Sequence, residues 1–407
     1  MADVLVLGAG PAGSTCAEVC ARAGLDVLVL EKRNTNWEKP CGGAVSERVI
    51  REFNIPISIF ERQPMTGILL GDASGDVVVI DDKQKSQGGT VMRSKFDSYL
   101  ASRIRNTGGK ILENSPATAI SVKDRRITSV TYRSPQGLKS LQADIVIDAT
   151  GTPPFLARKL GIYHVDLSLQ IACCQYHLAM PDKQIDDLIG NRIEIYFGDA
   201  LIPGYGYAWI FPKRGIVSVG IGALRRILMK RGINLRTQLD WFRTKHPVAS
   251  LKLKAASQIL MRQAHLIGVT GLTTPIYGPN WLITGEAAGF VSYVTGEGIY
   301  YSMVAGREAG KAAIRAIEEE QIAQETLKAY KTSTDRLIGG DMRWGPRLQK
   351  MFMSSQWKQQ KALKAAQDDK FFAILIAELL AGNLGYCTFY RKLFCRPDKL
   401  IKAALKY

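Results

Sequence analysis

The chain has 407 residues, of which 46% are hydrophobic, and a formal net charge of +17. This length and composition suit a globular protein with two or more packed domains and exclude a disordered or fibrous chain. No apolar run reaches the roughly 18 residues needed to span a bilayer, and Val4–Leu7 follows Met1 too closely for a signal peptide. Seven cysteines without a framework spacing indicate reduced thiols, so we expect a cytoplasmic protein.

The first 33 residues have the pattern of a strand, a glycine turn, a helix and a second strand. Val4–Leu7 and Val27–Leu30 are continuous apolar runs, which is typical of parallel strands that are buried on both faces. Between them, Thr15–Ala23 has the length of a helix, and Gly24 ends it. The pattern predicts a βαβ unit of the kind that binds dinucleotides.

Further elements follow in chain order. Strands are predicted within residues 67–92, a helix over 94–106, a strand meander over 111–142 and a buried strand over 143–150. From about residue 161 to 269 the strands have a more antiparallel style, with a helix near 237–243. A short buried strand at 281–284 and a long helix over 298–320 come next, and the remainder is helical and basic.

The first glycine turn has the sequence of a phosphate-binding loop, Gly8-Ala9-Gly10-Pro11-Ala12-Gly13. Gly8 permits the turn, Gly10 lets a pyrophosphate approach the backbone, and Gly13 lets helix and strand pack closely. The helix N-terminus, which begins near Pro11 and Ala12, stabilises the phosphate charge. Glu31, followed by Lys32, ends the second strand, where an acidic residue binds ribose hydroxyls. Alone, the glycine pattern also fits a structural turn; with strand, helix and acid in place, we interpret it as a dinucleotide site.

Two later stretches indicate which dinucleotide binds. The strand end Ala149-Thr150-Gly151 and the stretch Thr284–Gly289 resemble signatures of the large flavoprotein group that includes the aromatic hydroxylases. The resemblance implies FAD, with Gly151, Gly285 and Glu286 at the cofactor. Glu286 stands where most members carry Asp, and it would bind the ribityl chain.

The same resemblance implies two further contacts with the flavin. Arg93 matches the flavin-contacting arginine of the group, and a surface arginine is the alternative. The backbone amides of Gly296, Gly298 and Ile299, just before the long helix, would face the flavin pyrimidine and stabilise negative charge there. A simple helix start is the alternative for this stretch.

Two motifs narrow the family. Pro40-Cys41-Gly42-Gly43 and the stretch Tyr207–Pro212 resemble the Pro-Cys-Gly-Gly and Tyr-x-Trp-x-Phe-Pro motifs of geranylgeranyl reductases. A strand period of two puts Tyr207, Trp209 and Phe211 on one face, and such an aromatic wall suits a long hydrocarbon. Read alone, this stretch equally fits a strand with aromatic residues in its core. Over residues 3–320 the chain resembles these FAD-dependent enzymes, which saturate carbon–carbon double bonds of isoprenoid chains.

The resemblance implies a hydride from reduced flavin and a proton from the protein, delivered to adjacent carbons of the double bond. An isolated alkene has no carbonyl to polarise, so positioning and proton delivery carry the catalysis. Cys41 is the candidate catalytic residue beside the flavin, where it tunes access or relays the proton, and Gly42 and Gly43 would let it approach the ring. The alternative is a small apolar residue in a tight loop. The four histidines show no metal spacing, and no metal is expected.

Together these patterns predict an α/β fold, α+β overall. A Rossmann-type FAD-binding domain is expected over residues 1–160 with a return segment over 270–320. An antiparallel-sheet substrate-binding domain is inserted over 161–269, and a basic helical C-terminal region covers 321–407.

The basic C-terminal region predicts anionic partners, because residues 321–407 hold 16 Lys and Arg against 7 Asp and Glu. Asp398–Tyr407 has the pattern of a basic amphipathic helix, which lies in a membrane interface or packs on the enzyme itself. Prenyl lipids live in bilayers, so we expect an isoprenoid or prenyl-lipid substrate and peripheral contact with an anionic membrane. Nucleic acid is not expected as a partner, because only the charge supports it.

The electron donor stays open between NADPH and a reduced ferredoxin. There is no second Gly-x-Gly-x-x-Gly for a bound nicotinamide, and a small acidic ferredoxin would suit the +17 charge. The main alternative function is a flavin-dependent monooxygenase or halogenase of the same superfamily, although the Trp-x-Trp-x-Ile stretch of halogenases is absent. A quinone-reducing flavoprotein is a third reading, and the spacing of Cys387 and Cys395 does not provide its cluster segment.

Overall fold

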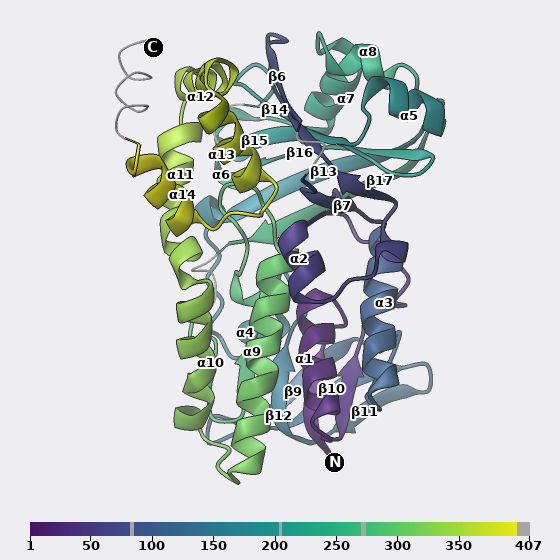
Figure 1. Cartoon of the computed structure of the whole chain (residues 1–407). Coiled ribbons are helices and arrows are strands. Elements are labelled where there is room, and N and C mark those ends of the chain that lie inside the picture. Colours follow the sequence, from purple (N-terminus) through teal and green to yellow (C-terminus); the bar gives the residue numbers. More distant parts are fainter. Residues whose placement is uncertain (82–84, 203–205, 270–273, 397–407) are drawn as a thin grey trace.

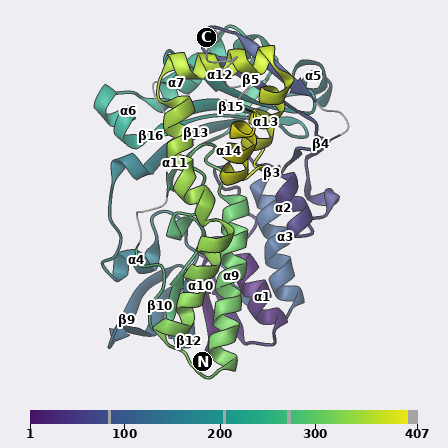
Figure 2. The ribbon, with the colours of Figure 1, turned by 60° about the vertical axis from the view of Figure 1, so that its left-hand side comes forward.

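The structure is a computed structural model that describes residues 1–81, 85–202, 206–269 and 274–396. Two sheet-based regions are stacked end to end (Figure 1). A parallel sheet with long helices forms the lower region, and a large, mainly antiparallel sheet forms the upper one, where the C-terminal helices gather. A view turned by 60° shows the same two layers (Figure 2).

The lower region is built on a five-stranded parallel sheet in the order β18-β12-β1-β2-β8. Its strands are β1 (Ala2–Leu7), β2 (Val27–Leu30), β8 (Lys110–Leu112), β12 (Ala143–Asp148) and β18 (Trp281–Ile283). The chain leaves β1 through helix α1 (Pro11–Arg22) and returns to β2, which is the predicted βαβ unit. Val4–Leu7 are almost fully buried, as the continuous apolar run predicts for a sheet covered on both faces.

Helix α1 packs closely against helix α9 (Ile299–Glu318). Gly306 of α9 lies against the Ala12 carbonyl, where any side chain would overlap backbone, and the Cys20 thiol lies 3.7 Å from the Gly310 carbonyl oxygen. This close approach brings the N-termini of both helices to one cavity. The other helices of this region are α3 (Arg93–Asn106), α4 (Phe155–Lys159), α10 (Gln324–Leu337) and α2 (Glu47–Glu52), with the 3₁₀ turns η1 (Ile57–Ile59) and η3 (Gly285–Ala288).

Two small sheets flank the parallel sheet. The first is the predicted meander, which consists of β9 (Ala117–Lys123), β10 (Arg126–Ser134) and β11 (Gly137–Leu141). Its turn lies at Ser134–Gly137, between β10 and β11. The second small sheet joins the two regions through β3 (Ala44–Ser46), β4 (Arg62–Met65) and β7 (Gly88–Thr90).

The upper region contains a seven-stranded sheet in the order β17-β13-β16-β15-β14-β5-β6. Its strands are β5 (Gly67–Asp72), β6 (Val77–Asp81), β13 (Gln170–Ala179), β14 (Arg192–Phe197), β15 (Gly206–Pro212), β16 (Ile216–Leu224) and β17 (Gln258–Gly268). All neighbours are antiparallel except β14 and β5. One face is covered by α5 (Asp182–Leu188), α6 (Arg225–Arg231), α7 (Leu235–Lys245) and α8 (Ala249–Leu253), and η2 (Leu167–Leu169) precedes β13.

The division of residues 1–160 and 161–269 into two domains needs one correction. Strands β5 and β6 lie in the segment predicted for the FAD-binding domain, yet they pair in the seven-stranded sheet through β14. The physical reason is that every residue of Gly67–Asp72 is buried, so both faces of this strand must be covered by other parts of the protein. The strand with which it pairs, β14, begins at Arg192, too far along the chain for a local pattern to reveal the pairing.

The C-terminal helices cover the other face of this sheet. They are α11 (Gly339–Met353), α12 (Gln356–Asp368), α13 (Lys370–Leu380) and α14 (Tyr386–Phe394). Leu363 of α12 and Ala377 of α13 pack with Trp209 and Phe211 in one apolar cluster. Among the residues that the structure describes, none of the helices is long and apolar enough to cross a membrane. The predicted helix at Asp398–Tyr407 lies outside the described residues.

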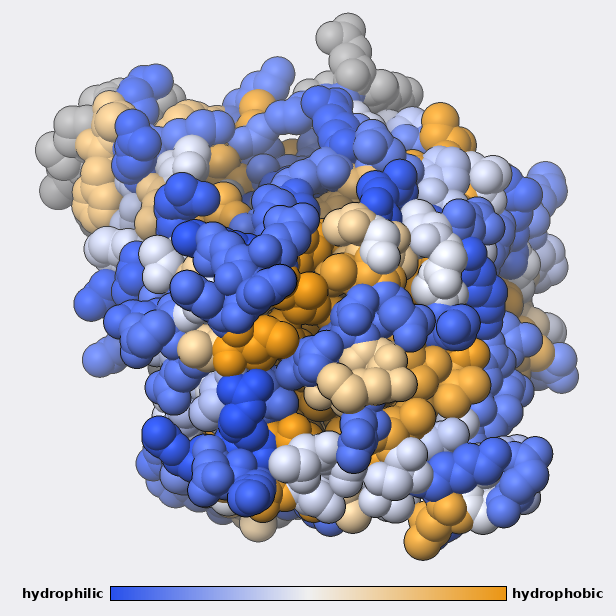
Figure 3. All heavy atoms as spheres, turned by 90° about the horizontal axis from the view of Figure 1, so that it is seen from below, coloured by the Kyte–Doolittle hydropathy of each residue, from blue (hydrophilic) through white to orange (hydrophobic). Residues whose placement is uncertain are grey.

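Seen from below, the molecular surface is mostly hydrophilic (Figure 3). Apolar side chains gather in recesses between charged ones rather than forming one continuous apolar face. This distribution agrees with the large number of charged side chains in the sequence.

Candidate active site

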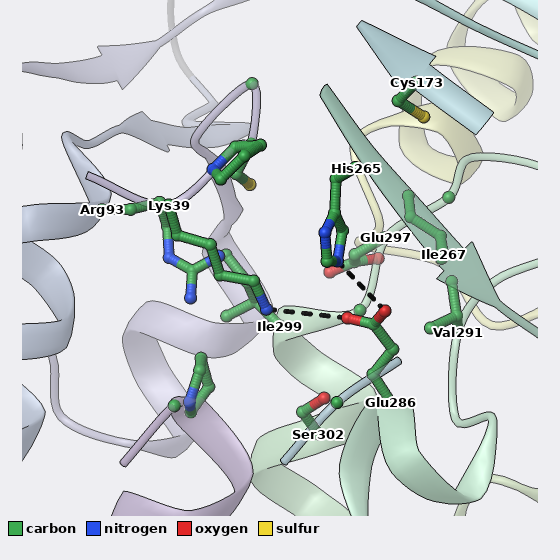
Figure 4. A pocket seen from close by; sticks show the side chains of 18 of the residues that line it. Lys39, Arg93, Cys173, His265, Ile267, Glu286, Val291, Glu297, Ile299 and Ser302 are labelled. Atoms are coloured by element: carbon green, nitrogen blue, oxygen red, sulfur yellow. Dashed lines mark ion pairs between the residues drawn. The ribbon is translucent and has the colours of Figure 1, made fainter. Parts of the chain in front are cut away.

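A cavity of about 680 Å³ lies where the two regions meet. Among the segments that line it are the first glycine turn, the Pro40–Gly43 loop, one face of β15 and the start of α9. Its volume is in the range of cofactor and ligand sites. Figure 4 shows a close view in which charged side chains from separate parts of the chain point toward one another.

The glycine turn forms a cradle of bare backbone. A Cβ on Gly13 would overlap the Gly8 carbonyl, so only glycine lets α1 start this close to the turn. Gly8 has φ +99°, a conformation that favours glycine. At Gly10, by contrast, an added Cβ meets nothing within 4 Å, because this position faces the open cavity. Pro11 and Ala12 also line the cavity at the N-terminus of α1.

The strand-end acid closes this cradle. Glu31 is buried, and its carboxylate accepts the Ala9 N–H at 2.7 Å and the Arg33 N–H at 3.0 Å. It therefore orders the glycine turn in addition to facing the cavity, and Lys32 lines the cavity beside it. Sequence reasoning assigned Glu31 only to a ribose.

A second carboxylate faces the cavity and lies between the side chains of Lys39 and His265 (Figure 4). Glu286 lies 3.6 Å from Lys39 Nζ and 3.3 Å from His265 Nε2. Burial alone would raise the pKa of Glu286, but Lys39 and His265 outweigh it and lower this pKa to about 2. The carboxylate is thus ionised at any physiological pH. Gly151 and Gly285, both with positive φ, make the turns that place it there.

Arg93 lines the cavity but is held by its own helix. Its guanidinium donates to both oxygens of Asp97 at 3.0 and 2.7 Å, and both side chains are buried. The Glu38 carboxylate accepts the Arg93 and Ser94 N–H groups and so caps the start of α3. Arg93 can therefore present only the outer part of its guanidinium to a bound ring.

A buried lysine, Lys213, holds the Pro-Cys-Gly-Gly loop in place through a hydrogen bond to its backbone. Cys41, Gly42 and Gly43 line the cavity, and the Cys41 sulfur accepts the Gly43 N–H at 3.4 Å. Lys213 Nζ donates to the Gly42 carbonyl at 2.6 Å and to Ser218 Oγ at 2.7 Å. Burial lowers the pKa of Lys213 to about 8. These bonds hold the loop at the level of the aromatic strand.

The aromatic side chains of β15 lie on the cavity face of the strand. Adjacent ring centroids of Tyr207, Trp209 and Phe211 are 5.9 and 6.4 Å apart, whereas Ala208 and Ile210 pack in the core behind them. The Tyr207 hydroxyl donates to the Thr295 carbonyl, which ties the wall to the loop before α9. Trp209 Nε1 is buried without a hydrogen-bond partner in the described part of the chain. Cys173 of β13 also faces this cavity.

The loop before α9 carries one acid that sequence reasoning did not single out. Gly296, Gly298 and Ile299 line the cavity as predicted for the amide cluster, and so does Glu297 between them. Burial raises the pKa of Glu297 to about 7, although Arg48 acts in the opposite direction. Glu297 and Glu286 therefore differ widely in acidity within one cavity.

These features fit FAD. A cradle that side chains would fill, a helix N-terminus and a strand-end acid suit the pyrophosphate and ribose. The cavity residues that would hold the rest of the group are Cys41 to Gly43, Arg93, Gly151, Glu286, Gly296, Gly298 and Ile299. Gly285, which was also predicted to contact the cofactor, packs against Ala12 instead and is not among the residues that line the cavity. Their individual roles stay predictions.

Among the charged or titratable cavity residues that were not predicted as functional candidates are Lys39, His265 and Glu297. Lys213, which supports the Pro40–Gly43 loop, was not predicted either. Lys39 and Glu297 stand inside the motifs Lys39–Gly43 and Thr295–Ile299, so the motifs themselves contained a signal. His265 is brought to the cavity by the pairing of β17 with β13, and Lys213 reaches the Gly42 carbonyl from the position just after β15.

Known proteins similar to this chain show the family to which it belongs. A family model described as FAD dependent oxidoreductase matches residues 3–160. Digeranylgeranylglycerophospholipid reductase of Methanocaldococcus jannaschii is 31% identical over 409 residues, which cover 98% of this chain and 96% of the relative. The enzyme of the same description from Thermoplasma volcanium is 30% identical over 336 residues, covering 81% and 82% of the two chains.

Solved structures share the architecture. A geranylgeranyl bacteriochlorophyll reductase-like protein from Thermoplasma acidophilum superposes with a TM-score of 0.81 at 25% identity, covering 96% of this chain and 98% of its own. A flavin-dependent brominase superposes with a TM-score of 0.76 at 19% identity, covering 98% and 99%, which shows a common fold alone. The family and the FAD dependence that the motifs predict are thereby confirmed. The chain is an FAD-dependent oxidoreductase and belongs to the geranylgeranyl reductase family.

Proposed function

We propose that this enzyme saturates carbon–carbon double bonds in the isoprenoid chain of a geranylgeranyl-type lipid. The supporting observation is one cavity that joins the FAD cradle to the aromatic wall of β15. When bound, FAD supplies the hydride in its reduced form. The relatives named as digeranylgeranylglycerophospholipid reductases suggest a lipid with such chains as the substrate.

The protein contributes position and a dry environment. Tyr207, Trp209 and Phe211 offer flat apolar surface on one side of the cavity, and Ile193 and Ile195 of the neighbouring strand extend it. Leu380 and Ala381 at the end of α13 also line the cavity, on the same face of the sheet as the aromatic wall. A hydrocarbon held between them is shielded from water, and a fixed alkene position lowers the entropic part of the barrier.

Cys41 is the proposed catalytic residue of the Pro-Cys-Gly-Gly loop. It stands half-buried at the cavity, with its sulfur oriented by the Gly43 N–H and its loop held by Lys213. In this position it controls access of the double bond to the cofactor or relays a proton.

The electron donor is proposed to be NADPH or a reduced ferredoxin. The excess of positive charge favours a small acidic protein, because complementary charge accelerates encounter. Peripheral contact with an anionic membrane is proposed on the same ground, with the C-terminal helices as the contacting part. Trp357 and Phe394 are each about 60% exposed there and are surrounded by lysines and arginines.

The deciding experiment is a single anaerobic turnover. The purified flavoprotein is reduced with dithionite, mixed with lipids that carry geranylgeranyl chains, and the products are analysed by mass spectrometry. The proposal expects two hydrogen atoms to be added per double bond as the flavin is oxidised. An unchanged lipid, with hydroxylated or halogenated product appearing only after oxygen is admitted, would support the monooxygenase or halogenase alternative instead.

A further inference from the structure

Saturating an alkene requires a proton as well as a hydride, and the proposed function leaves the source of that proton open. Most acids that line the cavity are already committed. Glu286 is ionised and lies beside Lys39 and His265. Asp97 accepts hydrogen bonds from Nε and Nη2 of Arg93. Glu31 accepts hydrogen bonds from two backbone N–H groups, and the Tyr207 hydroxyl donates its hydrogen bond to the Thr295 carbonyl.

Glu297 differs from all of these in its contacts. Within the described residues, no lysine, arginine or histidine nitrogen lies within 4 Å of its carboxyl group. Its one side-chain hydrogen bond in that part of the chain is a long one, 3.4 Å from Ser46 Oγ to Oε1. The other oxygen lies against the backbone of Gly382, where an added Cβ would clash with it. Among the described residues, the side chain thus borders the cavity without an ion pair inside 4 Å.

The charged and titratable groups around Glu297 come from several elements. Arg48 of α2 stacks on the Tyr300 ring at 3.4 Å and lowers the pKa of Glu297, whereas Asp341 of α11 raises it. The hydroxyl groups of Tyr301 and Tyr386 are nearby, and Tyr301 donates to Asp341 at 3.1 Å. Burial dominates, so the pKa of Glu297 is about 7.

Arg48 can stabilise the negative charge that Glu297 carries once it has lost its proton. Its Nε and Nη2 are buried and have no hydrogen-bond partner among the described residues. A guanidinium with unused donors near a neutral acid stabilises the carboxylate that forms when this acid gives up its proton. The pair is therefore arranged for Glu297 to change its charge.

We propose that Glu297 is the general acid of alkene reduction, an inference that rests on the proposed function. The Glu297 O–H bond breaks and a C–H bond forms at one alkene carbon as the π bond opens. The adjacent carbon receives the hydride, so that the two electrons come from reduced FAD, which is thereby oxidised. Water then reprotonates the carboxylate for the next turnover. Cys41 on this view positions the double bond and does not supply the proton.

The sign of the pH dependence follows directly. The pKa of Glu297 is raised from 4.5 to about 7, so the acid holds its proton below this value and loses it as pH rises through it. Single-turnover reduction of the alkene should be fastest on the acidic side and should fall tenfold per pH unit well above pH 7.

Three variants of the FAD-loaded enzyme test the proposal. Glu297→Gln keeps size and polarity but has no proton to give, Glu297→Asp keeps an acid at a shorter reach, and Glu286→Gln is the matched control in the same cavity. We expect Glu297→Gln to bind FAD and be reduced by dithionite like the wild type, yet to reduce the alkene roughly 100-fold more slowly without the pH limb. Glu297→Asp should regain part of the rate, and its rate should still fall above about pH 7, which we call the pH limb. Glu286→Gln should also keep this pH limb, whatever its affinity for FAD.

A second readout needs no turnover. Infrared spectra of the oxidised holoenzyme without substrate should contain a carboxylic-acid carbonyl band that disappears as pH rises through about 7, and Glu297→Gln should lack it. A Glu297→Gln enzyme with the wild-type rate and pH limb, or one that keeps the titrating band, overturns the proposal. So does loss of FAD binding in both Glu297 variants, which would make the residue structural. A wild-type enzyme that makes no saturated lipid while its band titrates would instead remove the proposed function.

Discussion

The Glu286 carboxylate lies 3.6 Å from the ammonium nitrogen of Lys39, across a separation of 247 positions in the chain. This pair joins the Pro-Cys-Gly-Gly loop to the turn after β18, which are the two segments predicted to enclose the flavin. Most flavoproteins of the wider group carry Asp at this turn, and the extra methylene of Glu286 is used here to reach a cation.

Replacing Glu286 with Gln should weaken FAD binding by roughly tenfold. The amide cannot neutralise Lys39, and it forms weaker hydrogen bonds to ribityl hydroxyls than a carboxylate does. Glu286→Asp should bind FAD more tightly than Glu286→Gln, because the charge remains. Titration of the apoprotein with FAD, followed by quenching of flavin fluorescence, gives both constants, and equal affinities of the two variants would contradict this role.

The same carboxylate predicts a dependence of stability on pH. The pKa of Glu286 is lowered from 4.5 to about 2, so its stabilisation is present above about pH 4.5 and is lost as pH falls through 2. Urea unfolding of the wild type and Glu286→Gln should therefore differ most at neutral pH and converge in strong acid. A difference that grows on acidification would show that the ion pair is not its origin.

Gly10 and Gly13 provide a matched pair for the cradle. Gly10→Ala should fold normally, because its Cβ meets no protein atom, but FAD affinity should fall roughly tenfold or more since the methyl group enters the cradle. Gly13→Ala should destabilise the apoprotein by about 3 kcal/mol because its Cβ overlaps the Gly8 carbonyl. Thermal unfolding of both apoproteins and FAD titration separate the two effects. Destabilisation by Gly10→Ala would place that residue in packing instead.

Trp209→Ala should raise KM for a prenyl substrate roughly 10- to 100-fold, because a large apolar surface of the cavity wall is lost. It should also cost about 3 to 5 kcal/mol of the free energy of unfolding, since Trp209 is only 7% exposed. Trp241→Ala is the control: it removes a tryptophan that packs against His246 away from the cavity. If both variants change KM equally, the effect comes from stability and not from the wall.

Much of the lower region could be predicted from the sequence because its signals are local. The βαβ unit, the meander and the long α9 follow from apolar runs, glycines and turn residues within short windows. The partnership of β5 with β14 could not be predicted, because pairing over more than a hundred residues leaves no local pattern. A continuous apolar run such as Gly67–Leu70 indicates burial but not which sheet provides it.

The sequence motifs predicted which segments form the site, but they did not predict the ion pairs and pKa values of its charged side chains. The residues Gly296, Gly298 and Ile299 predicted an amide cluster beside a cofactor, yet the pKa of Glu297 depends on distant segments. Burial raises it most, Arg48 and the hydrogen bond from Ser46 lower it, and the charge of Asp341 raises it. Arg93 shows a similar limit: the motif predicted a flavin contact, but not the ion pair that Arg93 forms with Asp97, four residues further along α3. The spacing constrains how this arginine meets a ring, which the family motif alone does not reveal.

Cys41→Ala should lower turnover about tenfold with normal FAD content, because the loop loses the sulfur that its own Gly43 N–H orients. The pH limb assigned to Glu297 should remain, since the proton source is unchanged. Cys41→Ser is the control for size. Full turnover of Cys41→Ala at normal FAD content would remove its catalytic assignment, and loss of the pH limb would return the proton to Cys41.

The C-terminal helices should carry the enzyme to anionic bilayers. Helices α12, α13 and α14 form one corner of the molecule (Figure 1), where Trp357 and Phe394 are exposed and Lys361 lies 3.9 Å from the Trp357 ring centroid. An aromatic ring that inserts at headgroup depth, with a lysine beside it for the phosphate, is typical of interfacial binding.

In vesicle flotation we therefore expect binding to phosphatidylserine-containing vesicles at low salt and little binding to neutral ones. Trp357→Ala combined with Phe394→Ala should weaken binding roughly tenfold or more, because two exposed aromatic rings that would insert into the interface are removed. Leu337→Ala removes an exposed apolar side chain from α10 and serves as the control, with binding unchanged. Because the headgroup attraction is electrostatic, added salt should release the wild type, and flotation that ignores both lipid charge and salt would contradict this contact surface.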